Sequence, residues 1–158
     1  MPHSLSGIGR RHFLMGGAGA LGSLSVGLPG PFAKTTIEPS EKVRLGIVGV
    51  RGRGHDLAQA FARNPEAEVV ALCDIDDSAL GKPIAAVEKL TGKSPRALKD
   101  FRKLLDDPNI DALVVATPDH WHALATVLAC KAGKDVYVEK PVSHNIIEGR
   151  RMVEAARK

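Results

Sequence analysis

The fold is decided by an apolar stretch that runs into a glycine-rich turn, Val43-Arg44-Leu45-Gly46-Ile47-Val48-Gly49-Val50-Arg51-Gly52-Arg53-Gly54. Its first part, up to Gly49, is the short apolar run expected of a strand that is buried on both faces. Apolar side chains then recur at helical spacing over residues 55–63. A strand, a glycine turn and a helix in this order predict the first unit of a parallel α/β sheet.

The same alternation continues along the chain. Further strands are expected at residues 67–72, 96–99, 110–116 and 135–138, and further helices at residues 79–90, 101–105, 122–131 and 146–157. Pro83 is expected to interrupt the helix over 79–90 or to delay its start, and Asp100 to cap the helix that follows it. Because right-handed crossovers join such strands, the predicted fold class is α/β, a Rossmann-type doubly wound parallel sheet.

The glycine turn has the features of a diphosphate site. Backbone N–H groups at a helix N-terminus bind a diphosphate when no side chain blocks its approach. Compared with the pattern G-x-G-x-x-G, Gly49 and Gly54 are the first and third glycines, and Arg51 replaces the second. Gly52 restores the clearance if the turn is shifted by one residue, while Arg51 and Arg53 either contact phosphate or face solvent. The candidate site comprises Gly49, Val50, Arg51, Gly52, Arg53 and Gly54.

An acidic residue follows the second expected strand. Asp74 stands where a dinucleotide site needs a carboxylate that accepts hydrogen bonds from the adenosine ribose. A carboxylate repels a 2′-phosphate, and residues 75–77 contain no Arg or Lys that would bind one. The sequence therefore favours NAD over NADP. The alternative for Asp74 is an ordinary turn residue at a strand end.

Two further motifs follow the fourth and fifth strands, Ala116-Thr117-Pro118-Asp119-His120-Trp121-His122 and Val138-Glu139-Lys140-Pro141. With the glycine turn, they make residues 43–158 resemble the N-terminal cofactor domain of the Gfo/Idh/MocA oxidoreductases, which include glucose–fructose oxidoreductase and inositol dehydrogenase. The family's usual Thr-Pro-Asn-x-x-His has Asn where this chain has Asp119. Both motifs lie beyond the carboxyl ends of strands, where open parallel sheets bind ligands.

The resemblance implies hydride transfer between a sugar or polyol and NAD. It assigns Thr117, Pro118, His122 and Glu139 to the cofactor site. It also implies that Lys140 contacts the cofactor, binds substrate hydroxyls and assists proton transfer. A lysine kept out of water at that place is suited to acid–base chemistry. The alternative for Lys140 is a solvated surface lysine.

Composition disfavours several other classes of partner. The net charge of +4 is spread along the chain, and no cluster interleaves aromatic with basic residues, so we expect no nucleic-acid partner. Cys73 and Cys130 each lie in an apolar run and are expected to be free buried thiols. His120 and His122 have no further Cys or His clustered nearby, so we expect no metal site.

The first residues differ in kind from the rest. Arg10-Arg11-His12-Phe13-Leu14 opens a weakly apolar, uncharged segment over 13–32 that resembles a twin-arginine signal. We expect a signal peptide at 1–33, a polar linker at 34–42 and export to the periplasm. The glycines and Pro29 of the segment argue against a stable membrane span. A disordered apolar leader is the alternative.

The resemblance also sets expectations about what the chain lacks. Gfo/Idh/MocA proteins carry a second α/β domain that supplies most of the substrate pocket, including a catalytic histidine. We expect a chain truncated before the last Rossmann strand and that domain, inactive alone, with a homo-oligomer as one possible assembly. Three hypotheses follow: a fragment of an exported NAD-dependent sugar or polyol oxidoreductase, a non-catalytic NAD-binding module, or a fragment of an NAD-dependent glycosidase.

Overall fold

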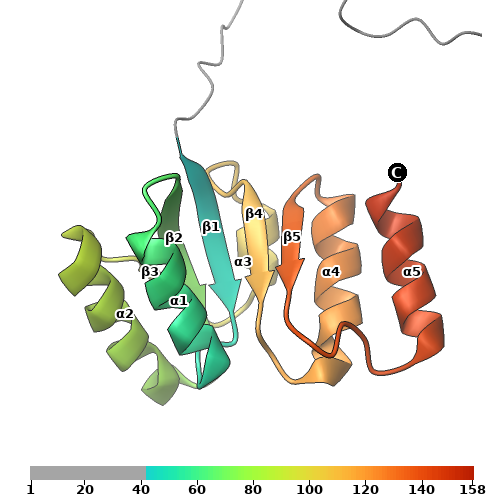
Figure 1. Ribbon diagram of the computed structural model, residues 1–158, viewed down its shortest axis with the longest axis horizontal. Coiled ribbons are helices and arrows are strands. Elements are labelled where there is room, and N and C mark those ends of the chain that lie inside the picture. Colours follow the sequence, from blue (N-terminus) through green and yellow to red (C-terminus); the bar gives the residue numbers. More distant parts are fainter. Residues whose placement is uncertain (1–41) are drawn as a thin grey trace, which may run out of the picture. The chain divides into compact units, whose positions relative to one another are not determined.

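A computed structural model describes residues 42–158, which form one five-stranded sheet (Figure 1). The strands are β1 (Val43–Val48), β2 (Ala67–Cys73), β3 (Arg96–Leu98), β4 (Ala112–Val115) and β5 (Asp135–Val138). They are all parallel and lie in the order β3-β2-β1-β4-β5. This arrangement confirms the Rossmann-type fold class. The expected signal at 1–33 and nearly all of the expected linker lie outside the described residues.

Helices cover both faces of the sheet (Figure 1). They are α1 (Arg53–Arg63), α2 (Asp77–Thr91), α3 (Arg102–Leu105), α4 (His122–Lys131) and α5 (Ile146–Ala156), with a short 3₁₀ helix η1 (Asp119–Trp121). Successive side chains of a strand point to opposite faces: Ile47 packs in the cluster under α1 and α2, and Val48 in the cluster under α3 and α4. Both faces of β1 are therefore buried, as its apolar sequence predicts.

Helix α2 is longer than the sequence suggested. It begins at Asp77, and the preceding residue, Asp76, caps it by accepting a hydrogen bond from the Ser78 N–H (2.9 Å). The helix continues through Pro83 without a break. The expected interruption at Pro83 is therefore wrong. The side chain of Pro83 is buried, so its packing offsets the loss of one backbone hydrogen bond. At α3, the residue at the N-cap position is Phe101 and not Asp100, one residue later than expected, although the Asp100 carboxylate accepts the Arg102 N–H (3.0 Å).

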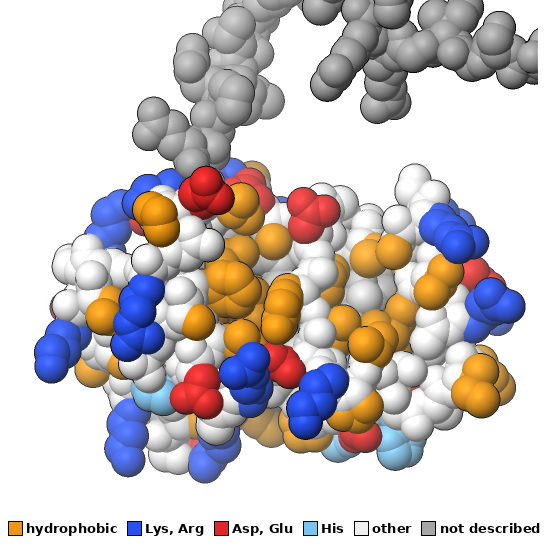
Figure 2. All heavy atoms as spheres, in the orientation of Figure 1, with side chains coloured by type: hydrophobic (Ala, Val, Ile, Leu, Met, Phe, Trp, Pro, Cys, Tyr) orange, Lys and Arg blue, Asp and Glu red, His pale blue; other side chains and the backbone are white. Residues whose placement is uncertain are grey.

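Charged side chains of both signs lie around the rim of the face that carries α1, and apolar side chains gather toward its middle (Figure 2). The rings of Phe61, on α1, and Tyr137, on β5, meet edge to face, with centroids 5.8 Å apart. Among residues 42–158, none of the helices is long and apolar enough to cross a bilayer.

Candidate functional site

The glycine turn between β1 and α1 packs directly on the segment that follows β4. Gly49 has a φ of 78°. A Cβ at this position would lie 2.8 Å from the carbonyl oxygen of Ala116 and from the amide nitrogen of Thr117. A Cβ at Gly54 would lie 1.8 Å from the carbonyl oxygen of Gly49. Neither position has room for a side chain, so the two glycines allow the strand end and the helix start to approach each other.

The middle of the turn is open. Gly52 has a φ of 45°, and a Cβ there would meet no atom within 4 Å. The residue directly precedes α1, whose first N–H groups carry the partial positive charge of a helix N-terminus. A backbone cradle with free space above it is what a diphosphate requires. The site therefore fits the dinucleotide that the sequence predicts, although Arg51 replaces the usual second glycine.

Asp74, directly after β2, holds the turn in shape. Its Oδ2 accepts the Val50 N–H (3.1 Å) and its Oδ1 accepts the Asp76 N–H (3.0 Å). A carboxylate oxygen has two acceptor positions, so each oxygen keeps one for a ribose hydroxyl. Asp74 thus serves both as a strand-end turn residue and as a candidate ribose ligand, two roles that the sequence presented as alternatives.

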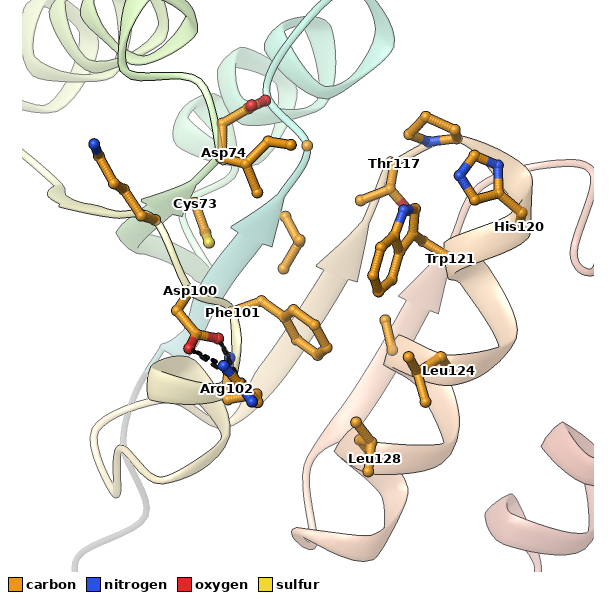
Figure 3. Close-up of a pocket in the computed structure, with 16 residues that line it drawn as sticks. Cys73, Asp74, Asp100, Phe101, Arg102, Thr117, His120, Trp121, Leu124 and Leu128 are labelled. Carbon is orange, nitrogen blue, oxygen red and sulfur yellow. Dashed lines mark hydrogen bonds and ion pairs between the residues drawn. The ribbon is translucent and has the colours of Figure 1, made fainter.

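A cleft of about 870 Å³ lies at the carboxyl ends of β1, β2 and β4. Figure 3 shows Asp74 on one side of it and Thr117, Trp121 and Leu124 on the other, with the ring of Phe101 between them. Its walls are largely apolar, which suits the flat face of an adenine ring. The cleft and the glycine turn share Gly49, so one elongated ligand can occupy both.

Thr117 and Cys73, two side chains of the cleft, differ in how readily they can bind a ligand or react. The hydroxyl oxygen of Thr117 is buried and has no hydrogen-bond partner among the described residues, so it is available to a bound ligand. Burial, helped by the negative charge of Asp74, raises the pKa of the Cys73 thiol to about 12. Cys73 is therefore an unreactive buried thiol, as expected. Cys130 is also free but only half-buried.

His122 lies beneath the cleft instead of lining it. Its side chain is 1% exposed. Its Nδ1 is 2.7 Å from the carbonyl oxygen of Pro141, and its Nε2 is 2.8 Å from that of Thr117. The ring thus connects the two motif segments after β4 and β5. This geometry gives His122 a positioning role between the two segments, and the cofactor contact that the resemblance implies for it stays a prediction.

Glu139 connects the glycine turn to the end of β5. Its Oε1 accepts hydrogen bonds from Arg53 Nε (2.8 Å) and the Tyr137 hydroxyl (3.2 Å), and its Oε2 accepts the Lys140 N–H (3.2 Å). The hydrogen bond from Arg53 is the main reason why the pKa of Glu139 is lowered. The carboxylate is therefore charged, and both of its oxygens accept hydrogen bonds. It fixes the backbone of Lys140 and does not itself face the cleft.

Lys140 is exposed to solvent in this part of the chain, so the described residues do not provide the burial expected for it. The Lys140–Pro141 peptide bond is cis. Nearby, Asp119 Oδ2 lies 3.3 Å from His144 Nδ1, and Asp119 Oδ1 lies 3.7 Å from His120 Nδ1. Residues 42–158 contain no group of three or more His, Cys, Asp or Glu side chains arranged to hold a metal ion.

The fold, the open glycine turn and the two motif segments can now be compared with known proteins. Residues 43–158 match the model of an oxidoreductase family with an NAD-binding Rossmann fold. The chain belongs to the Gfo/Idh/MocA family. The described residues are therefore an NAD-binding domain of an oxidoreductase family, which confirms the resemblance seen in the sequence.

Individual relatives agree with this assignment. A glycosyl hydrolase family 109 protein of Solibacter usitatus is 34% identical over 141 residues, which cover 85% of this chain and 32% of that protein. The WlbA dehydrogenase of Bordetella pertussis, solved with NADH and UDP-GlcNAcA, is 36% identical with a TM-score of 0.62 over 73% of this chain and 34% of WlbA. A probable dehydrogenase of Thermotoga maritima is 30% identical with a TM-score of 0.64, covering 73% of this chain and 33% of that protein. The chain thus spans about a third of the length of these Gfo/Idh/MocA relatives.

The structure adds site residues that the sequence patterns did not reveal. Asp76 pairs with Arg51, and Ile75 lines the cleft although its side chain is 88% exposed. The sequence does show an isoleucine between two aspartates directly after a strand, but the exposure of Ile75 is known only from the structure. Trp121 and Phe101, in contrast, come together only through the sheet order.

Proposed function

We propose that residues 43–158 bind NAD in preference to NADP, with the diphosphate at the start of α1 and the adenosine ribose on Asp74. The observation that carries this proposal is the free space at Gly52, where a Cβ would meet no atom within 4 Å. Gly49 and Gly54 bound this space, and a Cβ at either of them would clash with backbone atoms. The Asp74 carboxylate, whose Oδ2 accepts the Val50 N–H of the same turn, favours a free 2′-hydroxyl over a 2′-phosphate. Thr117 contributes an unpartnered hydroxyl to the same cleft.

Calorimetric titration of the full 158-residue chain with NAD and with NADP tests this proposal. We expect saturable binding of NAD and weaker binding of NADP. Gly54→Ala is the matched variant, because its Cβ would lie 1.8 Å from the Gly49 carbonyl oxygen, so that β1 and α1 must separate and the cradle is distorted. Equal NAD affinity in both proteins, or no NAD binding by a folded wild-type chain, contradicts the proposal.

We further propose that the chain is the cofactor-binding part of an oxidoreductase acting on a sugar or polyol. When bound, NAD supplies a hydride acceptor for a carbinol carbon. Lys140, exposed at the carboxyl end of β5, would take the proton of the oxidised hydroxyl. Glu139 holds the Lys140 backbone by accepting its N–H, and His122 holds the Pro141 carbonyl. The related WlbA dehydrogenase was solved with the sugar nucleotide UDP-GlcNAcA, which supports this substrate class.

There are two alternatives to a sugar or polyol oxidoreductase, one catalytic and one not. The similarity to the glycosyl hydrolase family 109 protein of Solibacter usitatus favours an NAD-dependent glycosidase. A protein that continues past residue 158 would then release the leaving group of a nitrophenyl glycoside without net NADH formation, whereas a dehydrogenase would accumulate NADH. A non-catalytic NAD-binding module is the remaining alternative. Oxidation of a sugar panel by the 158-residue chain with NAD, recorded as NADH absorbance, would exclude that module.

We also propose export through the twin-arginine route, on the basis of Arg10 and Arg11 and the weakly apolar segment after them. That route carries folded proteins, which suits an enzyme that must acquire NAD before it leaves the cytoplasm. Replacing both arginines by lysine is expected to retain the protein in the cytoplasm. Cell fractionation measures this, and unchanged export would contradict the proposal.

A further inference from the structure

Arg51 occupies a place where dinucleotide-binding turns usually have glycine, and its side chain has a defined partner. Its guanidinium forms an ion pair with the carboxylate of Asp76, and Nη2 also lies 3.4 Å from the hydroxyl of Ser78. Asp76 is tied in turn to the candidate ribose ligand, because its N–H donates to Asp74 Oδ1 (3.0 Å). A cation and its counter-charge therefore lie beside the place proposed for the ribose 2′-hydroxyl.

A second, smaller hollow adjoins this pair. It has a volume of about 440 Å³ and lies between the starts of α1 and α2, where Arg51, His55, Ser78 and Lys82 line it. The Nδ1 atom of His55 is buried and has no hydrogen-bond partner among residues 42–158. These are the groups that bind a phosphate: two cations, a hydroxyl and an imidazole. Two carboxylates oppose an anion there: that of Asp56, which also lines the hollow, and that of Asp76, which pairs with Arg51.

We propose that Asp76 decides which nicotinamide dinucleotide this chain accepts. Asp76 pairs with Arg51 and so prevents the guanidinium from binding a 2′-phosphate. Its carboxylate also adds a second negative charge beside Asp74. When the negative charge of Asp76 is removed, Arg51 and Ser78 are free to bind a 2′-phosphate, and Lys82 lines the same hollow. The inference rests on the proposed function, because it assumes that the ribose lies on Asp74. It gives a physical reason for the proposed preference for NAD in a chain with an arginine in its glycine turn, since an arginine near the ribose otherwise accommodates a 2′-phosphate.

Asp76→Asn is the decisive variant because it removes the charge and little else. Asp76 caps α2 by accepting the Ser78 N–H through Oδ1 (2.9 Å), and asparagine caps helices equally well. Asp76→Ser, which also caps, is a second route to the same charge change. Glu154→Gln is the matched control, since its carboxylate also pairs with an arginine, Arg151 (2.8 Å), and neither of these residues lines the cleft or the smaller hollow.

The probes are adenosine 2′,5′-bisphosphate and adenosine 5′-monophosphate, which differ only in the 2′-phosphate. We expect Asp76→Asn and Asp76→Ser to bind the bisphosphate about tenfold more tightly than the wild-type chain, as one charge-assisted contact to phosphate warrants. Binding of the monophosphate should change by less than about twofold, because it has no group facing Arg51. Glu154→Gln should alter neither affinity. Adding Arg51→Gln to Asp76→Asn should abolish the gain.

The outcomes separate this inference from the function on which it rests. If the folded wild-type chain binds neither the monophosphate nor NAD, the proposed function is wrong and this inference fails with it. If NAD binds but both Asp76 variants bind the bisphosphate no better than Glu154→Gln, only the role of Asp76 is wrong. A gain that persists without Arg51 would likewise overturn the mechanism, because the arginine would not be the group that is released.

Discussion

Nε of Arg53 lies 2.8 Å from Oε1 of Glu139, although the two residues are 86 positions apart in the sequence. One belongs to the first turn of α1, where the diphosphate is proposed to bind, and the other precedes Lys140. A single ion pair therefore joins the candidate cofactor cradle to the candidate catalytic lysine. The Glu139 side chain is 11% exposed and that of Arg53 is 59% exposed, so the carboxylate depends on its partners more than the guanidinium does.

Glu139→Gln is expected to lower the thermal unfolding midpoint and to weaken NAD binding. The glutamine keeps the shape of the side chain but removes the charge that Arg53 pairs with, and it leaves a nearly buried group with fewer partners. Differential scanning calorimetry and NAD titration measure the two effects. Glu154→Gln is the control, because the exposed pair of Glu154 with Arg151 (2.8 Å) should contribute almost nothing. Equal midpoints for the two variants would contradict the prediction.

Acid should destabilise the fold partly through Asp111. Arg44 donates to both of its oxygens from Nε (3.0 Å) and Nη2 (2.8 Å), and this hydrogen bonding lowers the pKa of Asp111 from its ordinary value of 3.8. A carboxyl whose pKa is lower in the folded state stabilises the protein above the ordinary value, and that contribution is lost as the pH falls through the folded pKa. Urea midpoints at about pH 6 and about pH 3 should therefore differ less for Asp111→Asn than for the wild type. An equal loss in both would assign the acid sensitivity to other groups.

The sequence predicted the parts of this structure that depend on local pattern. Every strand was placed within two residues of its observed ends, because buried parallel strands are continuous apolar runs. The expected interruption at Pro83 is wrong because this proline is buried in an unbroken helix, and burial depends on the tertiary fold and not on the local pattern. A sequence pattern also cannot predict the ion pairs of Arg51 and Arg53, because their partners depend on how the turn packs against the ends of β2 and β5. The pattern identifies candidate site residues, but it does not predict which of them form hydrogen bonds or ion pairs with one another.

Gly54→Ala and Gly81→Ala should have opposite effects on stability. At Gly54 the added Cβ would lie 1.8 Å from the Gly49 carbonyl oxygen, so β1 and α1 must separate. At Gly81, within α2, the Cβ would meet nothing within 4 Å, and alanine there should stabilise the helix by about 0.5–1 kcal/mol. Chemical denaturation of the three proteins measures the changes. A Gly54→Ala protein as stable as the wild type would mean that the turn relaxes without cost.

His122→Ala should destabilise the chain by about 2–4 kcal/mol, because it opens a cavity and leaves two carbonyl oxygens without their ring contacts. Those oxygens belong to Thr117 and Pro141, so both motif segments should loosen and NAD affinity should fall, although His122 does not line the cleft. His120→Ala, at the exposed neighbouring histidine, should change stability by less than about 0.5 kcal/mol. Urea unfolding and NAD titration distinguish the two variants. If His122→Ala loses stability but keeps its full NAD affinity, the ring supports the core without positioning the cofactor site.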